Sequence, residues 1–488
     1  MPTYTTEVNQ SSAFTTLPVG QELVMALSSD LCVAQELNVN FCFTIYQTHE
    51  SSLYLNGLIG TFKTTPNNEG VGMMDISNII QNYLSADNLA SEGSKFKIEG
   101  AYGKPIPMHI IDKFSRTDNG VRQIVVEGYT EYTDSTGTIQ QTSTISVGNF
   151  ITINGYVKHS NLLQWKDSTF TGNAFGIGFL LEDFAIQTGS TKNFLTNSPS
   201  TLSALSGDYG TLSYLGIQAL DQSAMHNDVT YLKIIMYPDY DAGGTTIGNV
   251  DLERTESNGA YDGTSNTAGI MANRILFFGA FPANIKAWSN DFNTYLNNGT
   301  MSSYTIGLYD SSDSLISELK TVNILCPNLK GYEQVRLTWL NQWGTWDYFT
   351  FNQKSVKTLA TKGTTYQQLG GTWNDTINNP FGYKGGKKSF RVNATEKIKM
   401  NTDYLTEEHS EWFEELINSP EIYILKDWES PRQEGAAQTG AILKSMSQYA
   451  TPVRLTTTSF TKKTVANDKL IQFTFEVEKS RNLRTQAI

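Results

Sequence analysis

The residues Ile471-Gln472-Phe473-Thr474-Phe475-Glu476-Val477-Glu478, near the end of the chain, alternate strictly between apolar and polar side chains. Successive side chains of a β-strand point to opposite faces of a sheet, so this period of two predicts a strand with one buried face. Phe41, Phe43 and Ile45 alternate in the same way and predict another such strand. The sequence therefore favours sheets that bury one face and expose the other.

The composition of the 488-residue chain agrees with this expectation. Charged residues make up 17% of the chain, below the roughly 25% usual for globular proteins. Thr, Ser, Asn and Gly take their place, and these residues suit turns and the solvent faces of strands better than helix interiors. We expect a mainly β protein with several antiparallel, β-sandwich-like domains and a few short helices.

Further strands and turns follow along the chain. Two strand patterns, Ile124–Tyr132 and Ile139–Ile153, flank the turn sequence Asp134-Ser135-Thr136-Gly137. Strand patterns are also found at 53–57, 95–99, 231–237, 274–278, 304–309 and 315–325, whereas 239–269 is dense in Gly, Asn, Asp and Thr and is interpreted as a loop.

Two segments predict helices. Ile76, Ile79, Ile80, Tyr83 and Leu84 fall on one helical stripe, with Asp75 or Ser77 as the cap. The second helix is expected from Glu407 to Asn418, with Thr406 as N-cap, and Pro420 ends it. Its expected buried stripe is Trp412, Phe413, Leu416 and Ile417, and its water-facing residues are Glu407, Glu408, Glu411, Glu414 and Glu415.

A chain of this length exceeds the roughly 250–300 residues that one hydrophobic core usually spans. We expect residues 1–38 to form an N-terminal arm or a first strand, and residues 39–160 to form a β-sandwich domain with one short helix. Residues 161–330 are expected to form a second sandwich-like domain, and residues 331–488 an α+β C-terminal domain.

Charge and cysteine content restrict the partners. The net charge of −12 argues against nucleic acid as the main partner, because phosphate binding needs a basic surface. We expect no membrane span, since no apolar run approaches roughly 20 residues. We also expect no secretory signal. The three scattered cysteines, Cys32, Cys42 and Cys326, are interpreted as free thiols of a protein made in a reducing compartment.

No catalytic motif stands out. The helical zinc-protease, nucleophile-elbow and phosphate-loop patterns are absent from the sequence, and Gly176-Ile177-Gly178 is better interpreted as a loop. A carboxylate pair for glycoside hydrolysis, or an oxygen-ligand site for calcium, remains an alternative in the acidic segments. The candidate residues are Asp239, Asp241, Asp251 and Glu253, or Asp347 alone.

The most specific segment is Val335–Phe351, which predicts a strand, a turn at Asn341 to Gly344 and a second strand. It holds three tryptophans within eight positions. Clustered aromatic residues pack in a core or at an interface with a neighbour, although a glycan-binding platform is an alternative use. The residues expected to serve packing or interaction are Trp339, Trp343, Trp346, Asp347, Phe349 and Phe351.

This segment resembles virion structural proteins of tailed bacteriophages, of the marine and crAss-like type and associated with the tail or neck. The residues that carry the resemblance are Leu337-Thr338-Trp339-Leu340-Asn341, Gly344, Trp346-Asp347 and Phe349-Thr350-Phe351. Gly70–Ile80 and Asn467–Phe475 carry it as well, so it covers about a tenth of the chain. The resemblance implies β-sandwich modules assembled in rings or clusters around a tail, neck or capsid vertex.

We therefore expect a non-enzymatic virion component of the tail, tail hub or head–tail connection, made in the cytoplasm of the host bacterium. Its expected partners are copies of itself and other virion proteins, and its N-terminus and the basic end from Lys479 to Arg484 are candidate docking arms. No cofactor or metal is expected. The alternatives are an adhesin that binds a host-surface glycan through exposed aromatics such as Trp343, a capsid-attached decoration or fibre protein, and a tail-borne cell-wall hydrolase.

Overall fold

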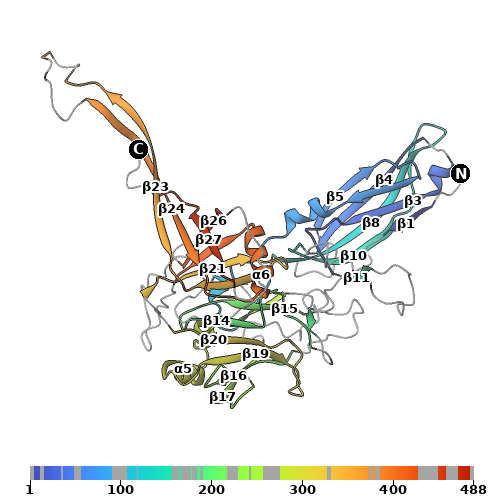
Figure 1. The fold of residues 1–488 in the computed structure, drawn as a ribbon. Coiled ribbons are helices and arrows are strands. Elements are labelled where there is room, and N and C mark those ends of the chain that lie inside the picture. The colour runs from blue at the N-terminus through green and yellow to red at the C-terminus, as the bar shows by residue number, and fades with distance from the viewer. Residues whose placement is uncertain are drawn as a thin grey trace, which may run out of the picture. The chain divides into compact units, whose positions relative to one another are not determined.

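The computed structural model describes residues 5–10, 16–34, 37–48, 57–90, 107–117, 119–156, 164–165, 177–178, 184–186, 189, 191–216, 229–240, 243–255, 275–326, 331–372, 376–377, 379, 385–426, 449–457 and 471–483. Over these residues the protein is mainly β, with several antiparallel sheets and a few short helices, which confirms the predicted fold class (Figure 1). No helix in the described part of the chain is long and apolar enough to cross a membrane.

The chain forms two compact units, and neither is continuous in sequence. The first consists of residues 1–325, 340–347 and 428–443, and the second of residues 326–339, 348–427 and 444–488. The limit predicted near 330 lies close to the start of the second unit at Cys326. Residues on both sides of the limit predicted near 160 belong to the first unit.

In the first unit, two sheets pack around one apolar core. One has the order β1–β3–β6; the other has the order β2–β10–β8–β4–β5, with β9 also paired to β8. Their strands are β1 (Thr6–Gln10), β2 (Thr16–Pro18), β3 (Val24–Ser29), β4 (Leu37–Thr48), β5 (Gly57–Thr64), β6 (Val71–Asp75), β8 (Val121–Thr133), β9 (Ile139–Gln141) and β10 (Ile145–Ile153).

The close approach of these two sheets is visible at their glycines. A Cβ added to Gly72 of β6 would lie 2.3 Å from the ring of Phe41, and one added to Gly128 of β8 would lie 2.6 Å from Leu27. Phe41, Phe43 and Ile45 are fully buried in the core between them, as their alternation predicts. Cys42 and Thr44 are buried as well, so the expectation of one exposed face is wrong for this part of β4. Because β1 pairs with β3, residues 6–10 form a strand of the sandwich.

The first unit also has short helical elements: α1 (Asp30–Val33), α2 (Ser77–Ile80), and the 3-10 turns η1 (Gln81–Tyr83) and η2 (Met108–Ile110). The helix predicted from Ile76 to Leu84 is thus one α-helical turn followed by η1. Asp75 Oδ1 accepts hydrogen bonds from the backbone N–H groups of Ser77 and Leu23, both at 3.0 Å. Burial opposes ionisation of this carboxyl, but the hydrogen bonds hold the pKa of Asp75 below its usual value.

Two further sheets complete the first unit. The order β13–β15–β18–β7 joins β13 (Ala185–Ile186), β15 (Thr211–Gly216), β18 (Ile275–Gly279) and β7 (Phe114–Arg116). The order β14–β20–β19–β16–β17 joins β14 (Thr201–Ala204), β20 (Lys320–Ile324), β19 (Ser303–Tyr309), β16 (Tyr231–Tyr237) and β17 (Gly248–Glu253). The unit also contains the strand pair β11 (Gln164–Trp165) and β12 (Ile177–Gly178), and the helices α4 (Pro282–Ile285) and α5 (Asn290–Asn297).

The second unit is built on a seven-stranded sheet in the order β22–β21–β25–β26–β27–β24–β23. Its strands are β21 (Val335–Leu340), β22 (Trp346–Phe351), β23 (Val356–Gln368), β24 (Gly386–Asn401), β25 (Ile422–Leu425), β26 (Ala450–Leu455) and β27 (Thr474–Lys479). The buried side of the aromatic helix α6 (Glu408–Asn418) packs against aromatic residues of this unit. Ile471, Phe473, Phe475 and Val477 are all buried, as their period of two predicts.

Several local predictions are wrong. β17 lies inside 239–269, which is interpreted above as a loop, and the single strand predicted over Ile139–Ile153 is two strands, β9 and β10. Thr406 does not cap α6: its hydroxyl bonds to His409 Nδ1 at 3.0 Å, and Glu407 occupies the cap position. Glu415 is buried and does not face water. The strand patterns at 53–56 and 95–99, and the acidic residue Asp241, lie outside the described residues.

Candidate functional site

The aromatic segment forms the predicted strand, turn and strand, as β21 and β22 with a turn between them. Residues 340–347 belong to the first unit, whereas 335–339 and 348–351 belong to the second. The six residues expected to serve packing or interaction are therefore divided. Trp343, Trp346 and Asp347 lie in the first unit, and Trp339, Phe349 and Phe351 lie in the second.

Asn341 organises the turn. Its side-chain Oδ1 accepts hydrogen bonds from the backbone N–H groups of Trp343 (3.0 Å) and Thr345 (3.1 Å). Its Nδ2 donates to the carbonyl of Leu195 at 2.9 Å, and Thr345 Oγ1 donates to the same carbonyl at 2.8 Å. An asparagine at the start of a turn mimics a backbone turn in this way. The turn is therefore held by side-chain bonds both within itself and to a segment about 150 residues earlier in the first unit.

Gly344 and the two tryptophans of the turn are closely packed. Gly344 has a φ of +75°, a conformation that favours glycine. Trp343 lies against Phe184 with ring centroids 4.3 Å apart. Trp346 donates its indole N–H to the carbonyl of Asp87 at 2.9 Å and meets the ring of His109 edge-on at 5.1 Å. Both tryptophan side chains are thus buried within the first unit.

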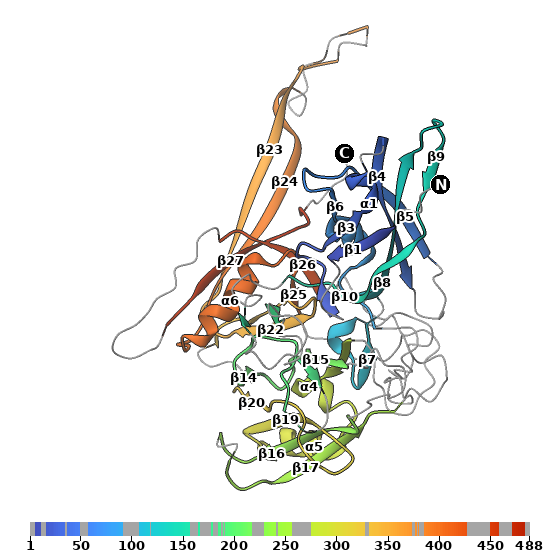
Figure 2. The ribbon, with the colours of Figure 1, turned by 90° about the vertical axis from the view of Figure 1, so that its right-hand side faces the viewer.

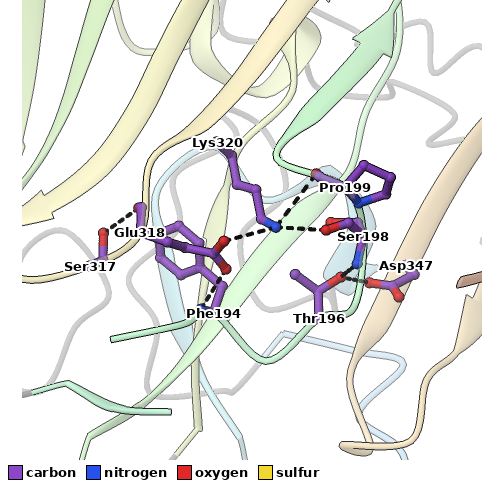
Figure 3. Close-up of polar contacts among 8 residues, drawn as sticks. All are labelled: Phe194, Thr196, Ser198, Pro199, Ser317, Glu318, Lys320 and Asp347. Carbon is purple, nitrogen blue, oxygen red and sulfur yellow. Dashed lines mark hydrogen bonds and ion pairs between the residues drawn. The ribbon is translucent and has the colours of Figure 1, made fainter. Parts of the chain in front are cut away.

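Asp347 accepts a hydrogen bond from Thr196 Oγ1 at 2.6 Å and is 3% exposed (Figure 3). Close to it, Lys320 of β20 is also buried, at 2% exposure. The ammonium group of Lys320 lies 3.0 Å from Glu318 Oε2 and donates to the carbonyls of Ser198 at 2.8 Å and Pro199 at 3.5 Å (Figure 3). Glu318 in turn accepts from the backbone N–H of Phe194 at 2.9 Å.

This arrangement ties the segment from Phe194 to Pro199 to β20. A buried ammonium group is tolerated when acceptors surround it, and Lys320 has a carboxylate and two carbonyls. Because the N–H groups of Lys320 donate to these acceptors, the side chain stabilises the fold by holding the two segments together. A catalytic base would instead need a free lone pair directed at a substrate. Asp347, considered above as a lone catalytic carboxylate, likewise bonds within the fold.

In the second unit, Trp339, Phe349 and Phe351 pack on α6. Ring centroids are 5.0 Å apart for Trp339 and Trp412, and 5.0 Å apart for Phe349 and Phe413. Phe351 stacks on Phe413 at 6.2 Å and also contacts Phe475 of β27. These rings make one aromatic core on the sheet. Trp339 and Phe351 are fully buried in it, and Phe349 is half-buried.

His409 lies at the margin of this aromatic core. Its ring meets Phe349, Trp412 and Phe413 at centroid distances of 6.2 to 6.5 Å. Burial among these rings disfavours the charged imidazolium and lowers the pKa of His409 to about 4. The histidine is therefore neutral near neutral pH, where it contributes to packing.

The glycan-binding alternative, which places Trp343 on an exposed platform, is wrong on that residue. Trp343 is 2% exposed, and Trp339 and Trp346 are 0% and 2% exposed. A sugar-stacking platform needs an open ring face. The acidic candidates Asp251 and Glu253 are exposed on β17, and among the described residues no group of three or more His, Cys, Asp and Glu side chains is placed to hold a metal ion.

The feature that sequence reasoning misses is the hairpin of β23 and β24. These strands pair from Val356 with Lys399 to Gln368 with Gly386, with one bulge. β24 pairs with β27 only over Lys397–Asn401, and farther along β24 the described residues show just a single bridge, from Ala394 to Leu483. β23 together with residues 386–395 is called the ribbon below. Figures 1 and 2 show it continuing beyond β26 and β27 of the same unit.

Neither face of the ribbon is covered. Every residue from Val356 to Gln367 is exposed, although side chains on a strand alternate between two faces. Large apolar side chains are exposed on both strands: Leu359 of β23 is 58% exposed, and Phe390 and Val392 of β24 are 53% and 47% exposed. Within the described part of its own unit, the ribbon therefore presents apolar side chains that nothing buries.

The basic end of the chain, which is expected above to be a docking arm, contacts β24 of its own unit. Lys479 belongs to β27 and forms a 2.6 Å ion pair with Glu396 of β24, and Leu483 makes the bridge to Ala394. The described residues of this segment are thus bound to the base of the ribbon. Comparison with known proteins finds no protein family that matches the chain and no curated protein with a similar sequence.

Proposed function

We propose that this chain is a non-enzymatic structural subunit of a tailed-bacteriophage particle, which acts by associating with copies of itself and with other virion proteins. Its place in the particle is the tail, the tail hub or the head–tail connection. The observation that carries the proposal is the ribbon, a long two-stranded element that serves no core of its own unit.

The energetics of an isolated ribbon support this role. A two-stranded hairpin by itself is marginally stable in water, and at least three strands or a packed partner are needed for independent stability. Exposed apolar side chains such as Leu359, Phe390 and Val392 add a further penalty unless a partner covers them. A subunit that inserts such an element into a neighbour gains both the apolar burial and the missing strand contacts.

The remaining support comes from the sequence. The resemblance of Val335–Phe351 to virion structural proteins implies β-sandwich modules, which agrees with the several antiparallel sheets of the chain. The buried polar groups of Asn341 and Lys320 bond to backbone carbonyls within the first unit. Cysteines that form no disulfide suit synthesis in a bacterial cytoplasm before assembly.

The direct test is the composition of purified particles. Particles of the phage that encodes this chain would be purified on a density gradient, and their proteins quantified by mass spectrometry. We expect a fixed copy number per particle, and antibody labelling in electron micrographs at the tail or neck. A chain that is abundant in the infected-cell lysate but missing from the particles would overturn the proposal, and a phage replication protein serves as the excluded control.

A further inference from the structure

We infer that the ribbon docks on the acidic surface of a second copy of this chain, held by charge and by its apolar side chains. The inference rests on the proposed function and names the partner. Its first basis is the charge of the ribbon. Lys357, Lys362, Lys387, Lys388 and Arg391 are all in it, and it contains neither aspartate nor glutamate.

The rest of the chain has the opposite charge. Removing these five cations from the 36 Lys and Arg residues leaves 31, against 48 Asp and Glu residues. The remainder of each copy therefore carries a net charge of −17, and the ribbon carries +5. Opposite charges on two surfaces favour their encounter and set their register. A second copy is thus a partner whose charge complements the ribbon.

The strand register places much of the positive charge on one face. Lys362, Thr364 and Tyr366 alternate along β23 and share a face, with Arg391 paired opposite Thr364 and Lys388 opposite Tyr366. Leu359 is on the other face, and so is Val392, which pairs opposite Gly363. Lys357 and Lys387, which pairs opposite Gln367, share that second face. One face of the ribbon therefore carries three of its five cations, and the other combines the apolar side chains of Leu359 and Val392 with two cations. Both faces thus offer a partner positive charge, and the second also offers apolar contact.

The size of the ribbon fits a specific interface. It comprises the 13 residues of β23 and residues 386–395 of β24. A standard protein interface uses roughly 20–30 residues on each side. The apolar side chains also distinguish between partner classes. Leu359, Phe390 and Val392 suit a protein surface, whereas a nucleic-acid backbone is bound chiefly through cations.

The first experiment measures self-association of the full chain by analytical ultracentrifugation at low and high salt. We expect concentration-dependent oligomers that weaken as salt rises, because salt screens the charge term. The variant K362E/K388E/R391E should raise the dissociation constant by tenfold or more. The control variant K354E/K426E/R454E makes the same charge change at two exposed lysines and one exposed arginine outside the ribbon and should associate like the original chain.

The second experiment identifies the partner. Replacing residues 361–394 by Asn-Gly removes most of the ribbon and joins Ala360 to Thr395, which are paired in the register, through a two-residue turn. This shortened chain keeps the acceptor surface. It should remain monomeric alone and form a mixed complex with a tagged full-length chain, and circular dichroism with thermal unfolding verifies that it is folded.

Three results would overturn the inference. The full chain could stay monomeric up to about 100 μM, well above the concentration range of specific assemblies. The charge-reversal variant could associate as well as the control. Alternatively, the full chain could bind duplex DNA and lose that binding with the reversed charges while never self-associating, which would make the ribbon a nucleic-acid arm. Each of these three results is compatible with the chain being present in purified particles. Failure of the inference about the ribbon is therefore distinguishable from failure of the proposed function, which the composition of the particles tests.

Discussion

Replacing Gly344 by alanine introduces a methyl group where the first unit has no room for it. The added Cβ would lie 1.7 Å from the carbonyl oxygen of Asn154 and 2.7 Å from its carbonyl carbon. An ordinary contact between carbon and oxygen is about 3.3 Å, so one of the two backbones must move by roughly 1.5 Å.

The backbone hydrogen bonds around this contact resist such a movement. Asn154 donates to the carbonyl of Gly120 at 2.8 Å, Gly344 donates to Asn341 at 3.1 Å, and Tyr156 donates to Gln342 at 2.8 Å. Breaking one or two of these bonds costs about 1 kcal/mol each, a left-handed alanine costs about 1–2 kcal/mol, and the residual overpacking about 1–3 kcal/mol. We expect Gly344→Ala to lower the free energy of unfolding by about 3–7 kcal/mol.

Gly137 provides the matched control, because it has a φ of +82° and an added Cβ there would meet no atom within 4 Å. Gly137→Ala should cost only the conformational term, about 1–2 kcal/mol. Urea unfolding followed by intrinsic tryptophan fluorescence compares the two, since Trp343 and Trp346 are buried next to Gly344. Equal destabilisation by the two substitutions would refute the steric reasoning.

Three further predictions concern buried groups. Trp346→Ala should destabilise the first unit by about 3–5 kcal/mol, and Trp346→Phe by about 1–2 kcal/mol for the lost bond to Asp87; an unchanged melting temperature would mean that the indole is exposed in solution. Because the folded-state pKa of His409 is about 4 and its ordinary value is 6.5, the unfolded chain binds more protons between these values, so stability should fall as pH decreases from 6.5 to about 4. The free energy of unfolding should fall by about 1–3 kcal/mol; the upper value converts the full pKa shift to energy, and the lower value allows for partial exposure of the ring. Urea titrations at pH 7 and pH 4.5 should show this difference in the original chain and not in His409→Leu. Lys320→Met should cost about 2–4 kcal/mol, because it leaves Glu318 without its partner, whereas the exposed Lys63→Met should cost less than about 1 kcal/mol in the same thermal scans.

The sequence predicts the fold class and the strands that bury one face. Ile471 to Val477 are recognisable because a buried face forces apolar residues to every second position. The same spacing identifies a strand at Phe41 to Ile45, although Cys42 and Thr44 are buried there as well. The aromatic packing of Trp412 and Phe413 on α6 followed in the same way from helical spacing. These elements carry their own signal because burial acts locally on the pattern.

The ribbon lacked such a signal for a physical reason. Neither face of β23 is buried, so its apolar residues show no period of two, and threonines fill much of the strand. The sequence of the ribbon shows only a content of β-branched residues and a local excess of cations without acidic residues. The division of Trp343 and Phe349 between two units was not predictable either, because it depends on contacts across long sequence separations, such as the bond from Trp346 to Asp87.

The interrupted course of the first unit has a consequence for synthesis on the ribosome. Residues 340–347 complete that unit, and Trp346 reaches back 259 positions to Asp87. When a nascent chain has emerged only as far as residue 325, the places of Asn341, Gly344 and Trp346 in the packed structure are still empty. Final packing of the first unit must therefore wait until residues 340–347 have been translated, after residues 326–339 of the second unit, and such non-local closure makes folding slow. The first unit therefore reaches its packed state only after synthesis of the second has begun.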